Sequence, residues 1–103
     1  MRIIKISTLR RFWAAHADSE KELRTWIRIT EGAKWASPAH VKQHFGVRVD
    51  FVKVASGNTV AVFDIANNRY RMIAAIHYDF PRVFVPRIFD HEEYDQDKWK
   101  DEL

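Results

Sequence analysis

The sequence predicts an α+β domain, in which two or three helices pack on one face of a small, mainly antiparallel, twisted sheet. Three observations predict this fold. Helical patterns fill the first half of the chain, alternating apolar runs fill the second half, and the turns between those runs suit antiparallel neighbours. With 103 residues there is room for one hydrophobic core, so residues 1–103 are expected to form a single domain.

The composition indicates a folded chain outside the membrane. Hydrophobic residues make up 47% and aromatic residues 14%, yet no apolar run approaches the length of a membrane span. Cysteine is absent, which excludes a disulfide framework and thiolate metal sites and suits a reducing cytosol.

The first 32 residues predict a short strand and two helices. Apolar residues at positions 3, 4 and 6 favour a strand within residues 1–6. Ser7 is a suitable N-cap for a first helix, and Ser19 with Glu22 forms the pattern of a capping box for a second helix that Gly32 ends. The apolar positions at helical spacing are Leu9, Phe12, Trp13 and His16 in the first helix, and Leu23, Trp26, Ile27 and Thr30 in the second.

A third, shorter helix is predicted from Pro38 to Phe45, because Ser37 precedes a proline at the first helical position and Gly46 follows as a stop. His40 and His44 lie one turn apart on it. They have two readings, as ligands of a zinc ion or as surface and helix-packing residues, and the second is favoured because no further ligand is evident. Three tryptophans are expected to fill the space between helices and sheet: Trp13, Trp26 and Trp35.

The second half of the chain reads as strands. Residues 47–54 form a strand or an irregular lead into one, and residues 56–58 have turn chemistry. A last main strand spans residues 83–89. Pro86 cannot donate a hydrogen bond to a ladder, so this strand lies at an edge or bulges there.

The central prediction is a β-hairpin from Thr59 to Ile76, with the turn at Asn67 and Asn68, which tolerate positive φ. Counting from this turn places Ile65 opposite Tyr70, Asp64 opposite Arg71, Phe63 opposite Met72 and Ala61 opposite Ala74. One face is then a core face. The other face carries Asp64, Arg69, Arg71 and His77 among smaller apolar residues.

Charge is distributed unevenly along the chain. Residues 90–103 hold seven acidic and two basic residues, a net of −5, so residues 1–89 carry the remaining 15 basic and 7 acidic residues, a net of +8. A basic body with an acidic tail fits a polyanion-binding surface, and it equally fits an ordinary solvated surface.

The last four residues, 100–103, spell Lys-Asp-Glu-Leu, the retention signal of the endoplasmic reticulum. That signal is read only in the lumen. Basic residues interrupt the apolar residues at the N-terminus, so no segment there resembles a signal peptide, and we interpret the match as coincidental.

Seven segments of the chain fall in the order and spacing of the HigB toxin family. They are Arg2-Ile3-Ile4, Leu9-Arg10-Arg11-Phe12-Trp13, Leu23-Arg24-Thr25-Trp26, Trp35-Ala36-Ser37-Pro38-Ala39, Val62-Phe63-Asp64-Ile65, Asn68-Arg69-Tyr70-Arg71-Met72-Ile73 and His91-Glu92-Glu93-Tyr94-Asp95. The resemblance covers nearly the whole chain. That family is similar in fold to the RelE toxins, so a RelE-like fold is implied.

The resemblance implies a cytoplasmic bacterial toxin of a type II toxin-antitoxin system, an endoribonuclease that cuts mRNA on the ribosome. It also implies a partner, a helix-turn-helix antitoxin of the HigA type, which neutralises the toxin and through which alone the pair would reach operator DNA. Neither a cofactor nor a metal is expected.

The same resemblance implies three catalytic residues. Arg71 falls where RelE-like toxins place an arginine facing the scissile phosphate, Tyr94 where they place a C-terminal tyrosine, and His91 matches the family's His-x-x-Tyr-Asp. The sequence departs from the family at four places: Asn67 stands for a usual glycine, Asp90 for a usual threonine, and Val62 and Asp64 stand where RelE has lysines.

These residue types suit RNA cleavage by the neighbouring 2′-hydroxyl. Arginine offers a planar fork of donors to phosphate oxygens, and histidine, with a reference pKa of about 6.5, exchanges protons near neutral pH. Each residue also has a structural reading: Arg71 pairs with Asp64 across the hairpin, His91 caps a tail helix, and Tyr94 docks that helix on the sheet.

Six further cations are candidates for contacts with RNA phosphates: Lys53, Arg69, Arg82 and Arg87, together with Arg10 and Arg11. If no RNA is cut, the same fold would serve as a non-catalytic RNA- or ribosome-binding module, or its basic face would only dock a partner protein.

Overall fold

In the computed structural model, which describes residues 1–96 and 98–103, a five-stranded sheet has the order β1-β5-β4-β3-β2. The strands are β1 (Arg2–Ile4), β2 (Val49–Lys53), β3 (Thr59–Ile65), β4 (Tyr70–His77) and β5 (Arg82–Asp90). All neighbours are antiparallel except β1 and β5, so the mainly antiparallel α+β fold predicted from the sequence is confirmed. Asp97 of the acidic tail lies outside the described residues.

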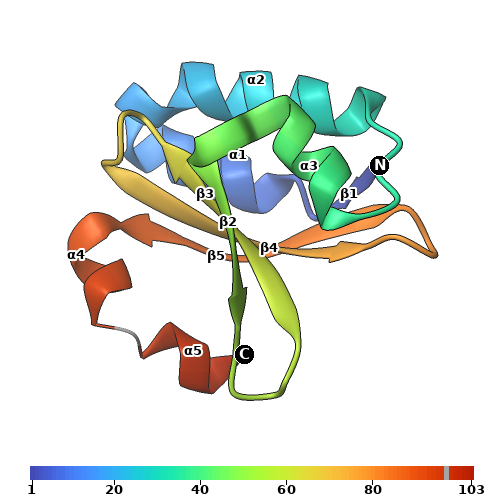
Figure 1. The fold of residues 1–103 in the computed structure, drawn as a ribbon. Helices are drawn as coiled ribbons and strands as arrows, with labels where there is room; N and C mark the ends of the chain where they lie inside the picture. The colour runs from blue at the N-terminus through green and yellow to red at the C-terminus, as the bar shows by residue number, and fades with distance from the viewer. Residues whose placement is uncertain (97) are drawn as a thin grey trace.

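Three helices cover one face of the sheet, as predicted (Figure 1). They are α1 (Ser7–Ala15), α2 (Glu20–Gly32) and α3 (Pro38–Phe45). We call this the upper face. Its core includes Leu9, Leu23, Trp26, Trp35, Val41, Phe45, Phe63 and Met72, and Trp13 packs partly buried against it. The expected role of these three tryptophans in the core is confirmed.

The hairpin of β3 and β4 has the predicted register, with Asp64 opposite Arg71 and the other three predicted pairs also formed. Its turn has φ of 54° at Asn67 and 70° at Asn68, the left-handed conformation that a primed turn needs. Ala66 also has a positive φ, of 54°. Because side chains alternate along a strand, this register decides which face of the sheet receives Arg71.

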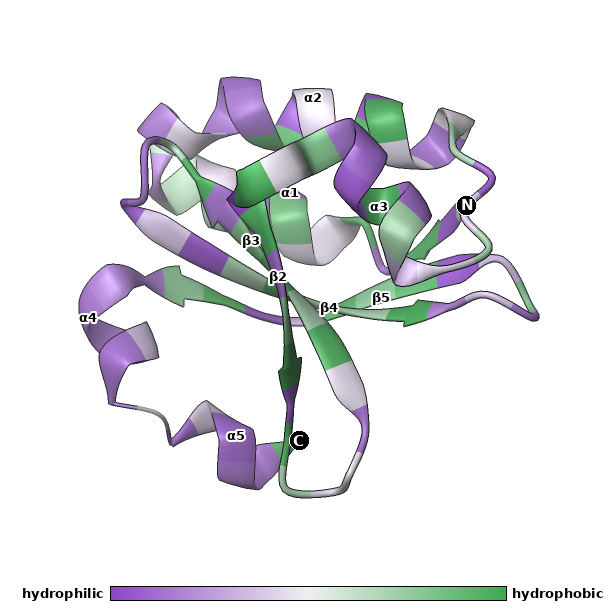
Figure 2. Ribbon diagram, viewed as in Figure 1, coloured by the Kyte–Doolittle hydropathy of each residue, from purple (hydrophilic) through white to green (hydrophobic). Residues whose placement is uncertain are grey.

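The opposite, lower face is more apolar than the sequence suggested. A second buried cluster lies there, formed by Val54, Val60, Val62, Ile73, Phe89 and Trp99. Two short helices at the C-terminus, α4 (His91–Asp95) and α5 (Trp99–Glu102), lie below the sheet in Figure 1. Figure 2 shows that both helices consist mostly of hydrophilic residues, and the buried Trp99 is the side chain through which α5 packs in the lower cluster.

Pro86 lies at an irregularity in β5. Ile73 of β4 pairs with Arg87 and Ala75 pairs with Phe84, so β5 has one more residue than β4 between these pairs, which is a β-bulge. Strand β1 covers β5 only at residues 82–84. Both predictions for Pro86, a bulge and an edge position, are therefore confirmed. The proline lies at the bulge, and it lies beyond the residues of β5 that pair with β1.

The predicted N-cap of α1 is wrong, whereas Ser19 is the N-cap of α2 as predicted but does not form the capping box. Helix α1 begins at Ser7 itself, after Ile6 in helical conformation, and Ser7 makes no capping hydrogen bond. At α2 the Ser19 hydroxyl donates to the carbonyl oxygen of His16 at 2.7 Å, and the Glu22 carboxylate accepts from the backbone N–H of Ala66 in the hairpin turn. A long-range partner therefore replaces the capping box.

The strand expected over residues 47–54 is shorter in the structure. Residues Gly46–Arg48 form a 3₁₀ turn, and β2 begins only at Val49. Gly46 has φ of 57°, which agrees with its predicted role as the residue that stops α3.

Replacing Trp99 by alanine should strongly destabilise the protein. The side chain is 3% exposed and belongs to the lower cluster, and a buried tryptophan replaced by alanine typically costs about 3–5 kcal/mol. Chemical denaturation measures the loss. Phe80→Ala is the matched control, because Phe80 is 72% exposed and its loss should change the free energy of unfolding by less than about 0.5 kcal/mol. Equal effects of the two substitutions would contradict the packing of α5 on the sheet.

Candidate functional site

Arg71 lies in the second position of β4, on the lower face, in register with Asp64 of β3 and Phe89 of β5. Its Nε donates toward Asp64 Oδ1 at 3.1 Å, and its Nη1 reaches the carbonyl oxygens of Asn68 and Tyr70 at 3.3 and 3.4 Å. The side chain is only 13% exposed. The predicted ion pair with Asp64 is confirmed, and it fixes the guanidinium beside the strand.

Tyr94 of α4 brings its ring over this guanidinium, with 5.5 Å between the ring centroid and the Arg71 Cζ, within cation-π range. The same ring stacks on Trp99, with 5.3 Å between centroids, and the Trp99 indole N–H donates to the carbonyl oxygen of Tyr94 at 3.2 Å. Tyr94 therefore docks the tail helix on the sheet, which was its structural reading, and it does so directly beside Arg71.

His91 is the first residue of α4. Its backbone N–H donates to the carbonyl oxygen of Arg69 at 3.0 Å, and its Nδ1 lies 2.9 Å from Asp95 Oδ2. The reading of His91 as the cap of this helix is wrong, because Asp90 is the N-cap and its Oδ1 accepts from the backbone N–H of Glu93 at 2.8 Å.

Arg71 and Tyr94 meet at one corner of the sheet, and His91 begins α4 at that corner. Phe89 pairs with Arg71 and Asp90 pairs with Tyr70, so α4 starts where β5 passes Arg71. The Arg69–His91 backbone bond and the Arg71–Tyr94 contact hold α4 against that end of β4. An arginine of β4 and a tyrosine of α4 are therefore in contact, and the backbone of His91 lies beside the same end of β4.

Four of the six predicted RNA-binding cations are spread over the sheet and its turns. Arg87 is on the same face as Arg71, opposite Ile73, and its Nη2 pairs with Glu102 at 2.8 Å. Arg69 pairs with Asp18 at 2.8 Å. Arg82 lies at the other end of β5, about 20 Å from Arg71 along the strands. Lys53 lies between two lower-face valines, 52 and 54, and so points to the upper side of the sheet edge.

Asp18 joins the N-terminal half of the chain to the hairpin. Its carboxylate accepts from the Tyr70 hydroxyl at 2.7 Å and from Arg69 Nη1 at 2.8 Å. These two hydrogen bonds lower the pKa of Asp18, and the hydrogen bond to Asp18 raises the pKa of Tyr70. Tyr70, the residue before Arg71, is therefore anchored on the upper face by its hydrogen bond to Asp18. No local sequence pattern indicates this long-range contact.

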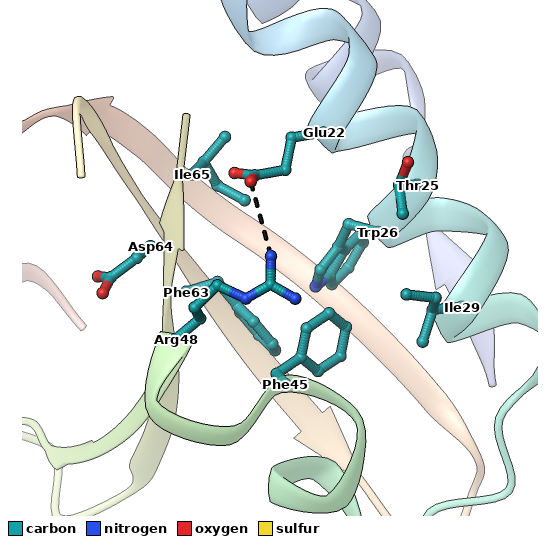
Figure 3. A pocket seen from close by; sticks show the side chains of 9 residues that line it. All are labelled: Glu22, Thr25, Trp26, Ile29, Phe45, Arg48, Phe63, Asp64 and Ile65. Atoms are coloured by element: carbon teal, nitrogen blue, oxygen red, sulfur yellow. Dashed lines mark ion pairs between the residues drawn. The ribbon is translucent and has the colours of Figure 1, made fainter. Parts of the chain in front are cut away.

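A small hollow lies behind the site, between α2, the 3₁₀ turn and β3. In Figure 3, Glu22 and Arg48 face each other across this hollow, with 3.7 Å between Glu22 Oε1 and Arg48 Nη1. The Asp64 carboxylate points away from both side chains. The cavity of about 20 Å³ is large enough for one water molecule. The Trp26 indole N–H is buried at this hollow with no partner among the described residues, and a water there would satisfy it.

The paired histidines of α3 have structural partners. His44 Nδ1 accepts from the Trp35 indole N–H at 2.8 Å, and His40 Nδ1 accepts from the backbone N–H of Ala36 at 3.1 Å. No cluster of metal-ligating side chains occurs within residues 1–96 and 98–103. The helix-packing reading of these histidines is the one that the contacts support.

A family model described as HigB_toxin, the RelE-like toxic component of a toxin-antitoxin system, matches residues 19–97. The chain belongs to this family. It is therefore a toxin, and an antitoxin is its partner. The matched range contains Arg71, His91 and Tyr94 and ends before α5, so Trp99 lies beyond it. No curated protein matches the chain.

None of the helices in the described part of this HigB-family toxin has the length and apolar character needed to cross a membrane.

Replacing Asp18 by asparagine should destabilise the toxin at neutral pH, because the Tyr70 hydroxyl and Arg69 lose a charged acceptor. Since folding lowers the pKa of Asp18, its contribution is complete above the ordinary value of 3.8 and is lost as pH falls through the lowered pKa. The melting temperatures of wild type and Asp18→Asn should thus differ by a constant amount from about pH 5 to 8 and converge in acid.

At alkaline pH the hydrogen bond from the Tyr70 hydroxyl to Asp18 should also contribute less to stability. Folding raises the pKa of Tyr70 above its ordinary value of 10.0, so this contribution is present below that value and is lost as pH rises through the raised pKa. Asp50→Asn is the control, since Asp50 bonds only to the N–H of its neighbour Phe51. A gap that stays constant into acid would contradict the role of the Asp18 carboxylate.

Proposed function

We propose that this HigB-family toxin is a ribosome-dependent mRNA endoribonuclease, which inhibits translation and growth by cutting transcripts with Arg71, His91 and Tyr94. The single observation that supports the proposal is the contact of Arg71 with Tyr94 at the α4 end of β4, where the backbone of His91 also bonds to the segment before that strand.

The reaction that fits these groups is attack of a 2′-hydroxyl on the adjacent phosphorus. The O2′–P bond forms and the P–O5′ bond breaks, which leaves a 2′,3′-cyclic phosphate and a 5′-hydroxyl. The step requires removal of one proton, donation of another to O5′ and neutralisation of the additional charge on the phosphorane.

Arg71 is suited to the charge. Its guanidinium stays protonated and donates in a plane, and it is oriented by Asp64 and by the ring of Tyr94. The scissile phosphate would replace the Asp64 carboxylate as its partner. His91 is suited to proton transfer, and half of its side chain is exposed for contact with RNA. These side chains carry the reaction without a metal or cofactor.

The cellular setting follows from the same proposal. The toxin would act in the bacterial cytoplasm on mRNA held by the ribosome, and its antitoxin would be a helix-turn-helix protein of the HigA type. Contact with operator DNA would occur only through that antitoxin.

The first test of the proposal is toxicity. Inducing the toxin alone should arrest growth, and primer extension should reveal new 5′ ends in transcripts. Arg71→Ala or His91→Ala should reduce cleavage by about a hundredfold to ten-thousandfold, the usual value of a lost charge or proton-transfer group, and should relieve the arrest.

Arg28→Ala is the matched control for that experiment, since it removes an exposed arginine from the outer side of α2. Melting temperatures of all variants separate loss of chemistry from loss of fold. Full toxicity of both folded site variants would remove these residues from the reaction.

One observation favours a second candidate, a non-catalytic module that binds RNA or the ribosome. The Arg71–Asp64 pair already satisfies the guanidinium in the free protein. If that pair never opens, the protein would bind with a strong dependence on salt and leave no cut ends.

The Asp64→Asn variant distinguishes the two functions. Loss of the carboxylate releases Arg71 from its partner and removes a nearby negative charge, so RNA should bind several-fold more tightly if phosphate replaces Asp64 in the complex. Fluorescence anisotropy with a labelled oligoribonucleotide measures this change. Asp50→Asn removes a carboxylate elsewhere on the sheet as the control, and equal affinity of wild type and Asp64→Asn would show that RNA phosphate does not reach Arg71.

A further inference from the structure

The end of the sheet remote from Arg71 carries a row of basic side chains. In the register of three neighbouring strands, Arg2 of β1 lies beside Arg82 of β5, and Arg82 lies beside His77 of β4. Ile3 and Val83 pack in the upper core, so alternation directs both arginines to the lower face. All three basic side chains are exposed.

Like charges directly opposite one another in a sheet destabilise it, and nothing in the described part of the chain compensates these two arginines. Neither forms an ion pair within residues 1–96 and 98–103, although Asp79 lies in the adjacent turn. The guanidinium of Arg82 is instead 6.0 Å from the ring of Phe80, which is 72% exposed. Arg87 and Arg69, by contrast, are both paired with carboxylates.

A hollow of about 330 Å³ opens on the same face beside this row. Its lining combines an aromatic ring, Phe84, with polar groups of Asn58, Thr59 and His77, and the rest is apolar. The volume falls in the range of small-molecule sites, and an apolar hollow with a few polar groups and one aromatic face suits a nucleobase.

We propose that this row and hollow form a second binding site for single-stranded RNA, with Arg2 and Arg82 on backbone phosphates and a base in the hollow against Phe84. We choose the occupant by its charge and shape, because two neighbouring exposed guanidinium groups attract an anion and a hollow with one aromatic face accommodates a flat apolar group. The proposal rests on the proposed function for its ligand, RNA.

The placement also gives the site a role. It lies on the same face as Arg71, about 20 Å away along β4. A strand of RNA held here and at Arg71 would be fixed at two points, so binding energy from the remote site would position the phosphate that is cut.

The test measures binding of a short fluorescein-labelled single-stranded oligoribonucleotide to the His91→Ala toxin, which leaves the RNA uncut. Arg2→Ala combined with Arg82→Ala should weaken binding about tenfold. The same double substitution should reduce the slope of log affinity against log salt by about 1.4, or about 0.7 for each phosphate that an arginine no longer neutralises. Arg28→Ala combined with Lys42→Ala removes the same charge from the helical side and should leave that slope unchanged.

The hollow is tested separately. Phe84→Leu keeps an apolar side chain but removes the aromatic face, and it should weaken binding about fivefold or more. Ultraviolet crosslinking of RNA that contains 4-thiouridine should label peptides from residues 75–86. Equal losses in the two double variants, or competition by duplex RNA equal to that by single strands, would overturn the site.

These outcomes are independent of the toxin's reaction. If induction of the toxin leaves transcripts intact but the Arg2 and Arg82 double variant still reduces the salt slope, the nuclease proposal fails and this site stands. If transcripts are cut and the two double variants bind alike, the reverse holds.

Discussion

The register of the β3–β4 hairpin is the constraint on which the rest of the site depends. Two asparagines with positive φ set the turn, and counting outward from them places Arg71 opposite Asp64 on the lower face. A slip of one residue would send the guanidinium to the upper core, where buried aromatic side chains could not solvate it. Two hydrogen bonds anchor that turn to the helical layer. Glu22 of α2 accepts from the Ala66 N–H on one side of the turn, and Asp18, which precedes α2, accepts from the Tyr70 hydroxyl on the other side. Electrostatics and turn chemistry thus specify the same pairing.

The lower face has two parts, one proposed to cut RNA and the other proposed to bind it. At the Arg71 end, Tyr94 and Trp99 cover the strands and connect the tail helices to the apolar cluster. At the other end, the face is open and carries arginines without ion-pair partners among the described residues, beside a hollow. Because Trp99 stacks on Tyr94 and Tyr94 contacts Arg71, the stability of the tail and the geometry of the proposed active site are linked. The helical face, by comparison, is occupied by core packing and by hydrogen bonds that use both histidines of α3.

The sequence was sufficient to predict the hairpin register, the three helices over one face and the bulge or edge at Pro86, because each depends on local periodicity or on the special geometry of asparagine and proline. It also predicted the Arg71–Asp64 pair, which follows from the register. It could not predict that Glu22 bonds to Ala66 instead of capping its own helix, since a distant backbone donor competes with the local one. The burial of Trp99 could not be predicted from the sequence either, because α5 has only four residues and is too short to show a periodic apolar face. The sequence placed Arg71 and Tyr94 in one site only through the family resemblance. In the structure, the contacts of Tyr94 with Arg71 and Trp99 bring the two residues together.

The proline in β5 has a consequence for contacts between copies of the toxin. Beyond residue 84, β5 has no neighbour among the described strands on the side where β1 has ended, and an uncovered strand normally offers a ladder of amide groups to any extended chain. Pro86 deletes one N–H from that ladder, and the extra residue of the bulge twists the backbone out of line with an approaching segment. The toxin therefore has a built-in obstacle to joining sheets at this margin, placed a few residues from the groups proposed to cut RNA.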